Sequence, residues 1–323
     1  MGPPFSQRFP ALAPLRGGDL LSSADLGAEE TLALLVLAAE FKRGSLRLDL
    51  SGKALGLIFT KASTRTRVSF SVAMGRLGGQ VLDLNPSVTQ VGRGEPVADT
   101  ARVLSRYVDA LAIRTFEQRE LADYAHWASV PVINALTDLE HPCQALADLL
   151  TIRENFGDLK GLTLTYVGDG NNMAHSLMLS GALLGMHVRV ACPEGFCPDP
   201  AVLDQARKLA GRAATISVLH EPVPAVRDAQ VLYTDVWASM GQEQEQQQRL
   251  QAFAGFCVDE ALLAEADPRA IVLHCLPAHR GEEISAGVIE GSASRVFDQA
   301  ENRLHVQQAL LAALLADPNT PCS

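Results

Sequence analysis

The sequence predicts an α/β fold of two domains, each a parallel sheet flanked by helices. Apolar runs alternate with segments of helical periodicity along the whole chain, which is typical of parallel sheets. A length of 323 residues favours two domains rather than one. The alternation restarts near Gly157 and Gly161. We therefore expect one domain over residues 1–155, joined by the C-terminal helical segment 300–323, and a second domain over 156–299.

The strands are expected where short apolar runs are bounded by turn residues. In the first domain these runs lie near 54–59, 80–84, 109–114 and 130–134, and a helix follows near 142–155. In the second domain they lie near 161–167, 187–191, 215–219, 230–235 and 270–275. A final helix is expected from about 300 to 316. It has no strand partner of its own, so we expect it to pack back on the first domain.

Composition and charge narrow the class of protein. The chain is 47% hydrophobic and 20% charged, and its formal net charge of −10 argues against a broad nucleic-acid-binding surface. No segment is long and apolar enough to cross a bilayer, and residues 1–20 lack a signal-peptide pattern. The six cysteines form no Cys-x-x-Cys pair and no zinc-type spacing, which favours reduced thiols in a cytoplasmic protein. The stretch 242–251, rich in Gln and Glu, is expected to form a solvated helix face.

A run of hydroxyl and cationic residues, 61–67, follows the expected strand 54–59 and opens a helix. Free backbone N–H groups and the positive end of the helix dipole favour an anion at such a place. A simple N-cap requires one hydroxyl and no cation. This run holds several of both, namely Ser63, Thr64, Thr66, Lys61, Arg65 and Arg67. We therefore predict a phosphate site.

Polar residues recur where the predicted strands end, which is where ligands bind in open α/β sheets. In the first half they are the 63–67 run, Arg114, Asn134 and His141. In the second half they are Asn171, Asn172, Asp235, His274 and Cys275. Because both halves contribute, we predict an active site in the cleft between the two domains.

The string His141-Pro142-Cys143-Gln144 is expected to open a helix, because proline is favoured in the first turn. His141 and Gln144 then lie one turn apart and present donors beyond the helix start, which suits an anion better than a plain cap. Arg114 taken alone is a surface arginine at a strand end; beside a phosphate pocket it is a second clamp. Gln90 lies in a loop with two glycines, either an ordinary loop or one that closes over substrate.

The string Gly168-Asp169-Gly170-Asn171-Asn172 resembles a dinucleotide turn, but Met173 replaces its third glycine. The two amides are suited instead to a carboxylate or an amino group. Asp235 either caps a turn or pairs with a substrate ammonium group. Cys275 is not expected to work as a Cys–His nucleophile, because the adjacent His274 points to the opposite face of a strand. The proline after Leu276 indicates that main-chain carbonyls there face the cleft.

Together these strings resemble the aspartate/ornithine carbamoyltransferase superfamily over about 20–316. Its carbamoyl phosphate motifs are similar to Ser63-Thr64-Arg65-Thr66-Arg67 and His141-Pro142-Cys143-Gln144. Its ornithine branch is marked by strings similar to Asp235-Val236-Trp237-Ala238-Ser239-Met240-Gly241 and His274-Cys275-Leu276-Pro277. The aspartate branch lacks the Ser-Met-Gly and His-Cys-Leu-Pro strings. Thr60 is a departure, because many relatives carry Glu there.

The resemblance implies transfer of the carbamoyl group of carbamoyl phosphate to the side-chain amine of L-ornithine, giving L-citrulline and phosphate in arginine biosynthesis. It assigns carbamoyl phosphate to Ser63, Thr64, Arg65, Thr66, Gln90, Arg114, His141, Gln144, Cys275, Leu276 and Arg303. It assigns ornithine to Asn172, Asp235, Ser239 and Met240, and catalysis to Arg114, His141, Asp235 and Cys275. It further implies no metal or organic cofactor, no nucleic-acid or membrane partner, and a homotrimer or a multiple of trimers.

Three alternatives follow from the same residues. A transcarbamylase could act on another amine, such as putrescine or an acylated ornithine, and Asp235 and Ser239 are the residues that would discriminate. A non-catalytic phosphate- or amino-acid-binding protein would keep the pocket without Arg114, His141 and Cys275, all of which are present. A nucleotide-dependent dehydrogenase is disfavoured by the missing glycine at 173.

Overall fold

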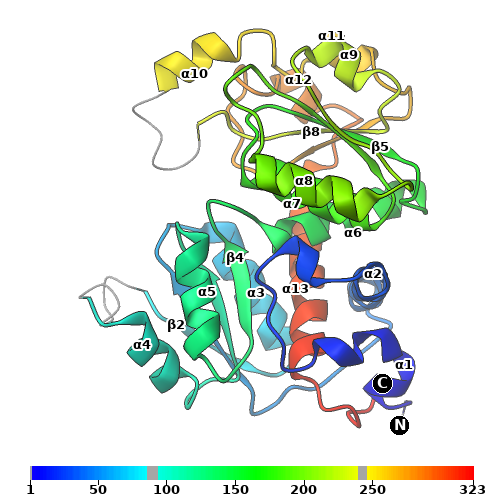
Figure 1. Cartoon of the computed structure of the whole chain (residues 1–323). Helices are drawn as coiled ribbons and strands as arrows, with labels where there is room; N and C mark the ends of the chain where they lie inside the picture. Colours follow the sequence, from blue (N-terminus) through cyan, green and yellow to red (C-terminus); the bar gives the residue numbers. More distant parts are fainter. Residues whose placement is uncertain (1, 86–93, 239–245) are drawn as a thin grey trace. The chain divides into compact units, whose positions relative to one another are not determined.

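The computed structural model describes residues 2–85, 94–238 and 246–323. The chain divides into two compact units. Unit 1 comprises Met1–Leu150 and Glu301–Ser323, and unit 2 comprises Thr151–Ala300. Each unit contains a parallel sheet flanked by helices, so the predicted fold class is confirmed (Figure 1).

The sheet of unit 1 has the strand order β2-β1-β3-β4. Its strands are β1 (Ala54–Phe59), β2 (Gln80–Asp83), β3 (Ala110–Arg114) and β4 (Val132–Leu136). Phe59 pairs with Arg114, so the carboxyl ends of β1 and β3 lie together. That register brings the segment after β1 beside the end of β3.

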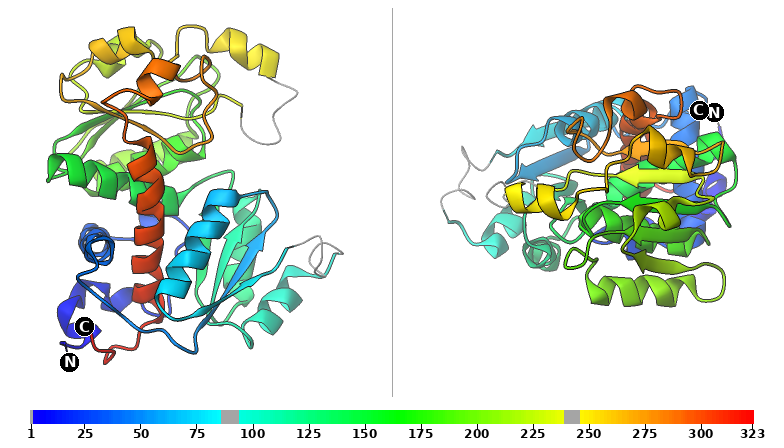
Figure 2. Two further views of the ribbon diagram at one scale, coloured as in Figure 1. Left: turned by 180° about the vertical axis from the view of Figure 1, so that it is seen from behind. Right: turned by 90° about the horizontal axis from the view of Figure 1, so that it is seen from above.

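The helices of unit 1 occupy both faces of this sheet. They are α1 (Phe5–Arg8), α2 (Ala28–Arg43), α3 (Thr64–Arg76), α4 (Val97–Leu104) and α5 (Gln118–Trp127), with short 3-10 helices η1 (Pro10–Leu15) and η2 (Ser23–Asp25). Helices α4 and α5 lie on one face of the sheet and α3 on the other (Figures 1 and 2). Two further helices, α6 (Pro142–Phe156) and α13 (Val296–Leu315), continue from one unit into the other.

The sheet of unit 2 has the strand order β7-β6-β5-β8-β9. Its strands are β5 (Thr163–Val167), β6 (His187–Ala191), β7 (Ile216–Leu219), β8 (Val231–Thr234) and β9 (Ile271–His274). Its helices are α7 (Asn172–Leu183), α8 (Pro200–Ala210), α9 (Pro222–Val226), α10 (Gln246–Ala252), α11 (Glu260–Ala264) and α12 (Ala286–Ile289). Thr234 pairs with His274, so the residues after β8 and β9 meet at one edge.

Burial explains why these segments became strands. Strands β3, β5, β8 and β9 are buried at every position, because helices cover both faces of a parallel sheet and each face then needs apolar side chains. The expected boundaries agree with the observed ones to within a few residues. The largest difference is at α13, which begins at Val296 rather than near 300. The Ser294 hydroxyl, two residues before the helix, accepts a hydrogen bond from the Val296 N–H at 3.5 Å.

Within the described ranges 2–85, 94–238 and 246–323, the chain has no helix with the length and apolarity that a bilayer crossing requires.

Candidate active site

The start of α3 has the local structure of an anion site. Ser63 is its N-cap, and its hydroxyl accepts a hydrogen bond from the Thr66 N–H at 3.3 Å. The helix has no acidic residue in its first turn, so no carboxylate of that turn opposes an anion. Its N-terminal N–H groups and dipole favour negative charge at this point.

Arg303 of α13 joins three residues assigned to the phosphate site. Its guanidinium donates to the Thr66 hydroxyl at 2.6 Å, to the Gln144 side-chain oxygen, and to His141 Nε2 at 3.4 Å. All four side chains are buried. A planar guanidinium holds several partners at fixed angles, so the beginnings of α3 and α6 are tied to one side chain of α13.

His141 is held in a neutral form. Burial lowers the pKa of His141 well below its usual value, and the positive charges of Arg303 and Arg114 lower it further. Because Nε2 accepts from Arg303, the neutral ring carries its proton on Nδ1. His141 is therefore a neutral N–H donor at pH 7, suited to an oxygen that gains negative charge.

The cations of the 61–67 run have different roles. Arg67 forms an ion pair with Asp83 and lies over the Phe59 ring at 5.2 Å, so its charge already has a partner, and its place in the anion site stays a prediction. Arg65 is exposed. The pKa of Lys61 is lowered by burial and by the charge of Arg114, which indicates a concentration of positive charge around the end of β3.

Thr60 and Cys143 have structural roles beside this site. The Thr60 hydroxyl donates to the Arg114 carbonyl at 3.1 Å and the Thr60 N–H to the same oxygen at 2.9 Å. Thr60 therefore fastens β1 to β3 without a charge of its own. The Cys143 thiol is buried, donates to the Asn134 carbonyl at 3.4 Å, and has a pKa raised to about 12 by burial. It is not a reactive thiol.

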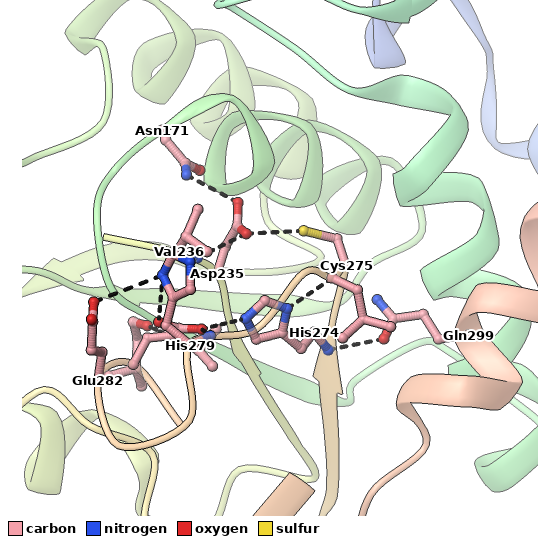
Figure 3. Close-up of polar contacts among 12 residues, drawn as sticks. Asn171, Asp235, Val236, His274, Cys275, His279, Glu282 and Gln299 are labelled. Carbon is pink, nitrogen blue, oxygen red and sulfur yellow. Dashed lines mark hydrogen bonds and ion pairs between the residues drawn. The ribbon is translucent and has the colours of Figure 1, made fainter. Parts of the chain in front are cut away.

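In unit 2, the strings that contain Asp235 and Cys275 lie in contact at one edge of the sheet. The Cys275 thiol donates to the Asp235 carboxylate at 3.0 Å, and the Asn171 side-chain amide donates to the other carboxylate oxygen at 3.2 Å (Figure 3). Asn171 also caps α7, accepting from the Met173 N–H at 2.9 Å. Asp235 is 7% exposed, so this edge offers a buried carboxylate to a cation.

A buried chain of contacts shapes the backbone after β9. His274 Nδ1 accepts from the Leu276 N–H at 2.8 Å, and its Nε2–H donates to Glu283 at 3.0 Å. Leu276 has a φ of 60°, rare for a residue with a side chain. Since its N–H is used by His274, the Leu276 carbonyl is the main-chain group suited to a ligand. The imidazole thus contacts Leu276 and Glu283, whereas the Cys275 thiol contacts Asp235.

Sequence reasoning missed Glu283 and Arg249. Arg249 lies in the stretch expected to be a solvated helix face, yet its side chain is 8% exposed and pairs with Asp169 at 2.7 Å. It also donates to the Trp237 carbonyl at 2.8 Å, which holds the segment after Asp235. The expectation is wrong at Arg249, although its described neighbours Gln247 and Gln248 are exposed. A lone cation within a stretch of Gln and Glu was the available signal.

The remaining assigned residues divide into two groups. Asn172 is the first residue of α7 and is half-buried. Gln90, Ser239 and Met240 lie outside the described residues, and their assigned roles stay predictions.

The fold and these two sites are those of a two-domain enzyme that binds an anionic donor in one unit and an acceptor in the other. Two family models match the chain. The carbamoyl-P binding domain of aspartate/ornithine carbamoyltransferase matches residues 18–154, and the Asp/Orn binding domain of the same family matches residues 160–314. The chain belongs to the aspartate/ornithine carbamoyltransferase family.

Relatives of known name agree with this family. An ornithine carbamoyltransferase of Parasynechococcus marenigrum is 73% identical over 94% of this chain and 96% of its own length. One of Prochlorococcus marinus (strain MIT 9313) is 71% identical over the same shares. The crystal structure of ornithine carbamoyltransferase from Gloeobacter violaceus has a TM-score of 0.86 and 59% identity, covering 93% of this chain and 99% of that one.

Proposed function

We propose that this chain transfers the carbamoyl group of carbamoyl phosphate to the side-chain amine of L-ornithine, forming L-citrulline and phosphate. The contact that carries the proposal is the hydrogen bond from Cys275 to Asp235. It joins the two strings that resemble the ornithine branch, at the edge where an acceptor would bind. The high identity to chains named ornithine carbamoyltransferase supports the same substrate pair.

Carbamoyl phosphate is assigned to unit 1. Its phosphate is proposed to accept hydrogen bonds from the start of α3, over Ser63, Thr64, Arg65 and Thr66, with Gln90. A phosphate dianion there is stabilised by helix N–H groups and by charge-assisted donors. Its carbamoyl end is proposed to meet Arg114, His141, Gln144 and Arg303, and the main-chain groups of Cys275 and Leu276.

Ornithine is assigned to unit 2. The Asp235 carboxylate would pair with an ammonium group of ornithine. Asn172, Ser239 and Met240 would complete the site. The family also includes enzymes for aspartate, and Asp235 decides between the two. Its buried carboxylate attracts an ammonium group and repels the side-chain carboxylate of aspartate.

The chemistry requires a neutral amine. Ornithine must lose one side-chain proton to solvent before it can react, and the Asp235–Cys275 pair is proposed to relay that proton and to orient the neutral nitrogen. The nitrogen then bonds to the carbamoyl carbon, whose oxygen gains negative charge. Thr66, Arg114 and His141 are proposed to donate to that oxygen; losing one such donor typically costs roughly a hundred- to a thousand-fold in rate.

The intermediate then collapses to products. The bond between the carbamoyl carbon and the phosphate oxygen breaks, and phosphate leaves with a proton from the attacking nitrogen. Transfer needs the two substrates to meet in the reacting enzyme. Correct alignment of two reactants supplies on the order of 7–11 kcal/mol of the barrier in favourable cases.

The test is a citrulline-formation assay with purified protein, carbamoyl phosphate and one of three amines. We expect ornithine to be carbamoylated, with aspartate and putrescine at least about a hundredfold poorer in kcat/KM. Aspartate places a carboxylate against Asp235, and putrescine lacks the α-carboxylate of ornithine. Faster turnover of putrescine or aspartate than of ornithine would refute the proposed substrate. No turnover of any amine, with carbamoyl phosphate still bound, would favour a non-catalytic binding protein.

We further propose that the chain acts in the cytoplasm, in arginine biosynthesis, as a homotrimer. Family resemblance supports these assignments. Light scattering of the purified protein checks the trimer, and a mass of one or two chains would refute it. Restoration of growth without arginine in a strain lacking citrulline synthesis checks the biosynthetic direction.

A further inference from the structure

A second cluster of ligating side chains lies in unit 2, at the ends of β6 and β7. Cys192 follows β6, His220 follows β7, and Cys197 ends the short loop after Cys192. The two sulfur atoms are 3.7 Å apart. Both sulfurs and one ring nitrogen of His220 all lie within 4.8 Å of one another.

We propose that Cys192, Cys197 and His220 bind a thiophilic divalent metal ion such as Zn²⁺, with solvent as the fourth ligand. Zinc in proteins is tetrahedral, with zinc–sulfur bonds of about 2.3 Å. Two sulfurs bonded to one tetrahedral zinc are therefore about 3.8 Å apart. The observed 3.7 Å matches that separation without movement of either side chain. Each thiol releases its proton to solvent as its sulfur bonds the metal.

The separation fits a metal better than a disulfide. The sulfurs of a disulfide are about 2.05 Å apart and need a defined dihedral angle. Cys192 and Cys197 would have to approach by about 1.7 Å to reach that length. Cys192 is buried and Cys197 is exposed. A metal ion can therefore approach the pair from solvent on the Cys197 side.

His220 is prepared for a ligand by its other contact. Its Nδ1 lies 3.0 Å from the carbonyl oxygen of Cys192. A carbonyl only accepts, so Nδ1 carries the proton and Nε2 keeps a lone pair. Metal-binding histidines commonly have one nitrogen held by a carbonyl in this way, which fixes the tautomer and the ring orientation.

The backbone holds the ligands at fixed positions. The Cys192 N–H donates to the Leu219 carbonyl at 3.0 Å, which ties the residue after β6 to the end of β7, one position before His220. The Gly170 N–H donates to the Phe196 carbonyl at 2.8 Å, one position before Cys197. A Cβ at Gly170 would come within 2.4 Å of the Cys197 backbone, so the loop packs closely there.

The spacing of Cys192 and Cys197 is compatible with a zinc site. Cys192 and Cys197 form a Cys-x4-Cys pair, which lies within the range of spacings seen in zinc sites. The third ligand is remote in sequence and is supplied by the neighbouring strand. The expectation of no zinc-type spacing is therefore wrong for this pair.

The test is an anaerobic titration of the reduced, metal-free protein with Co²⁺, followed by competition with Zn²⁺. Cobalt bound to thiolates in a tetrahedral site gives a sulfur-to-metal charge-transfer band and strong visible absorption. We expect one equivalent per chain and displacement by zinc. The C197S and H220Q variants should weaken cobalt binding by more than the roughly 10- to 100-fold that loss of a supporting hydrogen bond costs. Both side chains are exposed, so both variants should keep the wild-type circular dichroism.

Two matched variants locate the site. C257S removes a half-buried thiol elsewhere in unit 2, and C275S removes the thiol of the second group of possible ligands, Asp235, His274 and Cys275. Both should retain the band. Absence of the band in the wild type, or a band kept in C197S and H220Q but lost in C275S, would overturn the proposal. The readout is independent of citrulline formation, so it stands or fails separately from the proposed reaction.

Discussion

The guanidinium of Arg303 donates to the hydroxyl of Thr66 across 2.6 Å, although 237 positions of sequence separate the two residues. The same side chain contacts His141 and Gln144. One arginine near the end of the chain therefore positions the first turns of α3 and α6. This relationship makes the C-terminal helix part of the proposed phosphate site rather than only a packing element.

Replacing Arg303 by lysine tests that role. Lysine keeps the charge but has no planar fork, so it cannot hold Thr66, His141 and Gln144 together. We expect R303K to weaken carbamoyl phosphate binding about 10- to 150-fold, from loss of one charged hydrogen bond worth about 1.5–3 kcal/mol. Calorimetric titration measures the affinity. R43K, an exposed arginine of α2, should bind as the wild type does, and equal affinities for R303K and R43K would contradict the assignment.

Arg65 and Arg67 lie on the same helix turn, but we expect their replacement to have different effects on carbamoyl phosphate binding. R65A should keep the fold and sharply weaken carbamoyl phosphate binding, because Arg65 is exposed and is assigned to the phosphate. R67A should leave binding nearly unchanged, because Arg67 is paired with Asp83; an exposed pair of this kind contributes about 0–1 kcal/mol to stability. Binding titrations and thermal melts of both variants distinguish the two effects. The reverse order of affinities would refute our assignment.

The elements of the fold were predictable because their signals are local. Apolar runs bounded by glycines gave the strands, and Ser63 and Pro142 marked helix starts that the structure contains. Strand ends in a parallel sheet meet at one edge, so the meeting of Asp235 with Cys275 also followed from the pattern.

Contacts that depend on a third element were not predictable. The salt bridge of Arg67 with Asp83 depends on where β2 lies beside β1. Burial of Arg249 depends on Asp169, 80 positions earlier. The meeting of His220 with Cys192 and Cys197 depends on the pairing of β6 with β7. Hydrophobic periodicity contains no information on such partners.

The pKa of His141 predicts how stability depends on pH. Its folded pKa lies well below the unfolded value of about 6.5, so the unfolded state binds more protons between the two values. His141 therefore leaves stability intact above about pH 7 and lowers it as the pH falls through 6.5, by up to about 1.4 kcal/mol per pH unit.

The H141Q variant should show a smaller loss of stability from pH 7.5 to 5.5 than the wild type. A slope remains because burial also lowers the pKa of His305. Urea unfolding of unit 1 is followed through Trp127 in a W237F background, since the chain has two tryptophans. R43K should keep the wild-type slope. An H141Q slope equal to that of the wild type would contradict a neutral buried His141.

Asp235 is expected to control the affinity for ornithine. D235N keeps the shape but removes the negative charge that pairs with an ammonium group, and a charged hydrogen bond is worth about 1.5–3 kcal/mol. We expect kcat/KM for ornithine to fall at least about tenfold, with carbamoyl phosphate affinity retained. D204N, an exposed carboxylate on α8, is the matched control. An unchanged kcat/KM in D235N would remove Asp235 from the ornithine site.

Glu283 offers the sharpest test of how the backbone after β9 is held. One of its oxygens, Oε1, accepts from His274 Nε2 at 3.0 Å and from the His279 N–H at 2.6 Å, in a fully buried position. E283A leaves the buried His274 Nε2–H without an acceptor, which costs about 1–3 kcal/mol, and also frees the part-buried His279 N–H. E283Q retains a carbonyl oxygen that can accept both bonds.

We therefore expect E283A to destabilise unit 2 by about 1–3 kcal/mol, with E283Q much closer to the wild type. The measurement is urea unfolding followed through Trp237 in a W127F background. Because His274 also holds the Leu276 N–H, E283A should lower the rate of citrulline formation at concentrations of urea where unit 2 is still folded, and E283Q should restore it. Equal stabilities of E283A and E283Q would show that Glu283 fills space without organising the turn at Leu276.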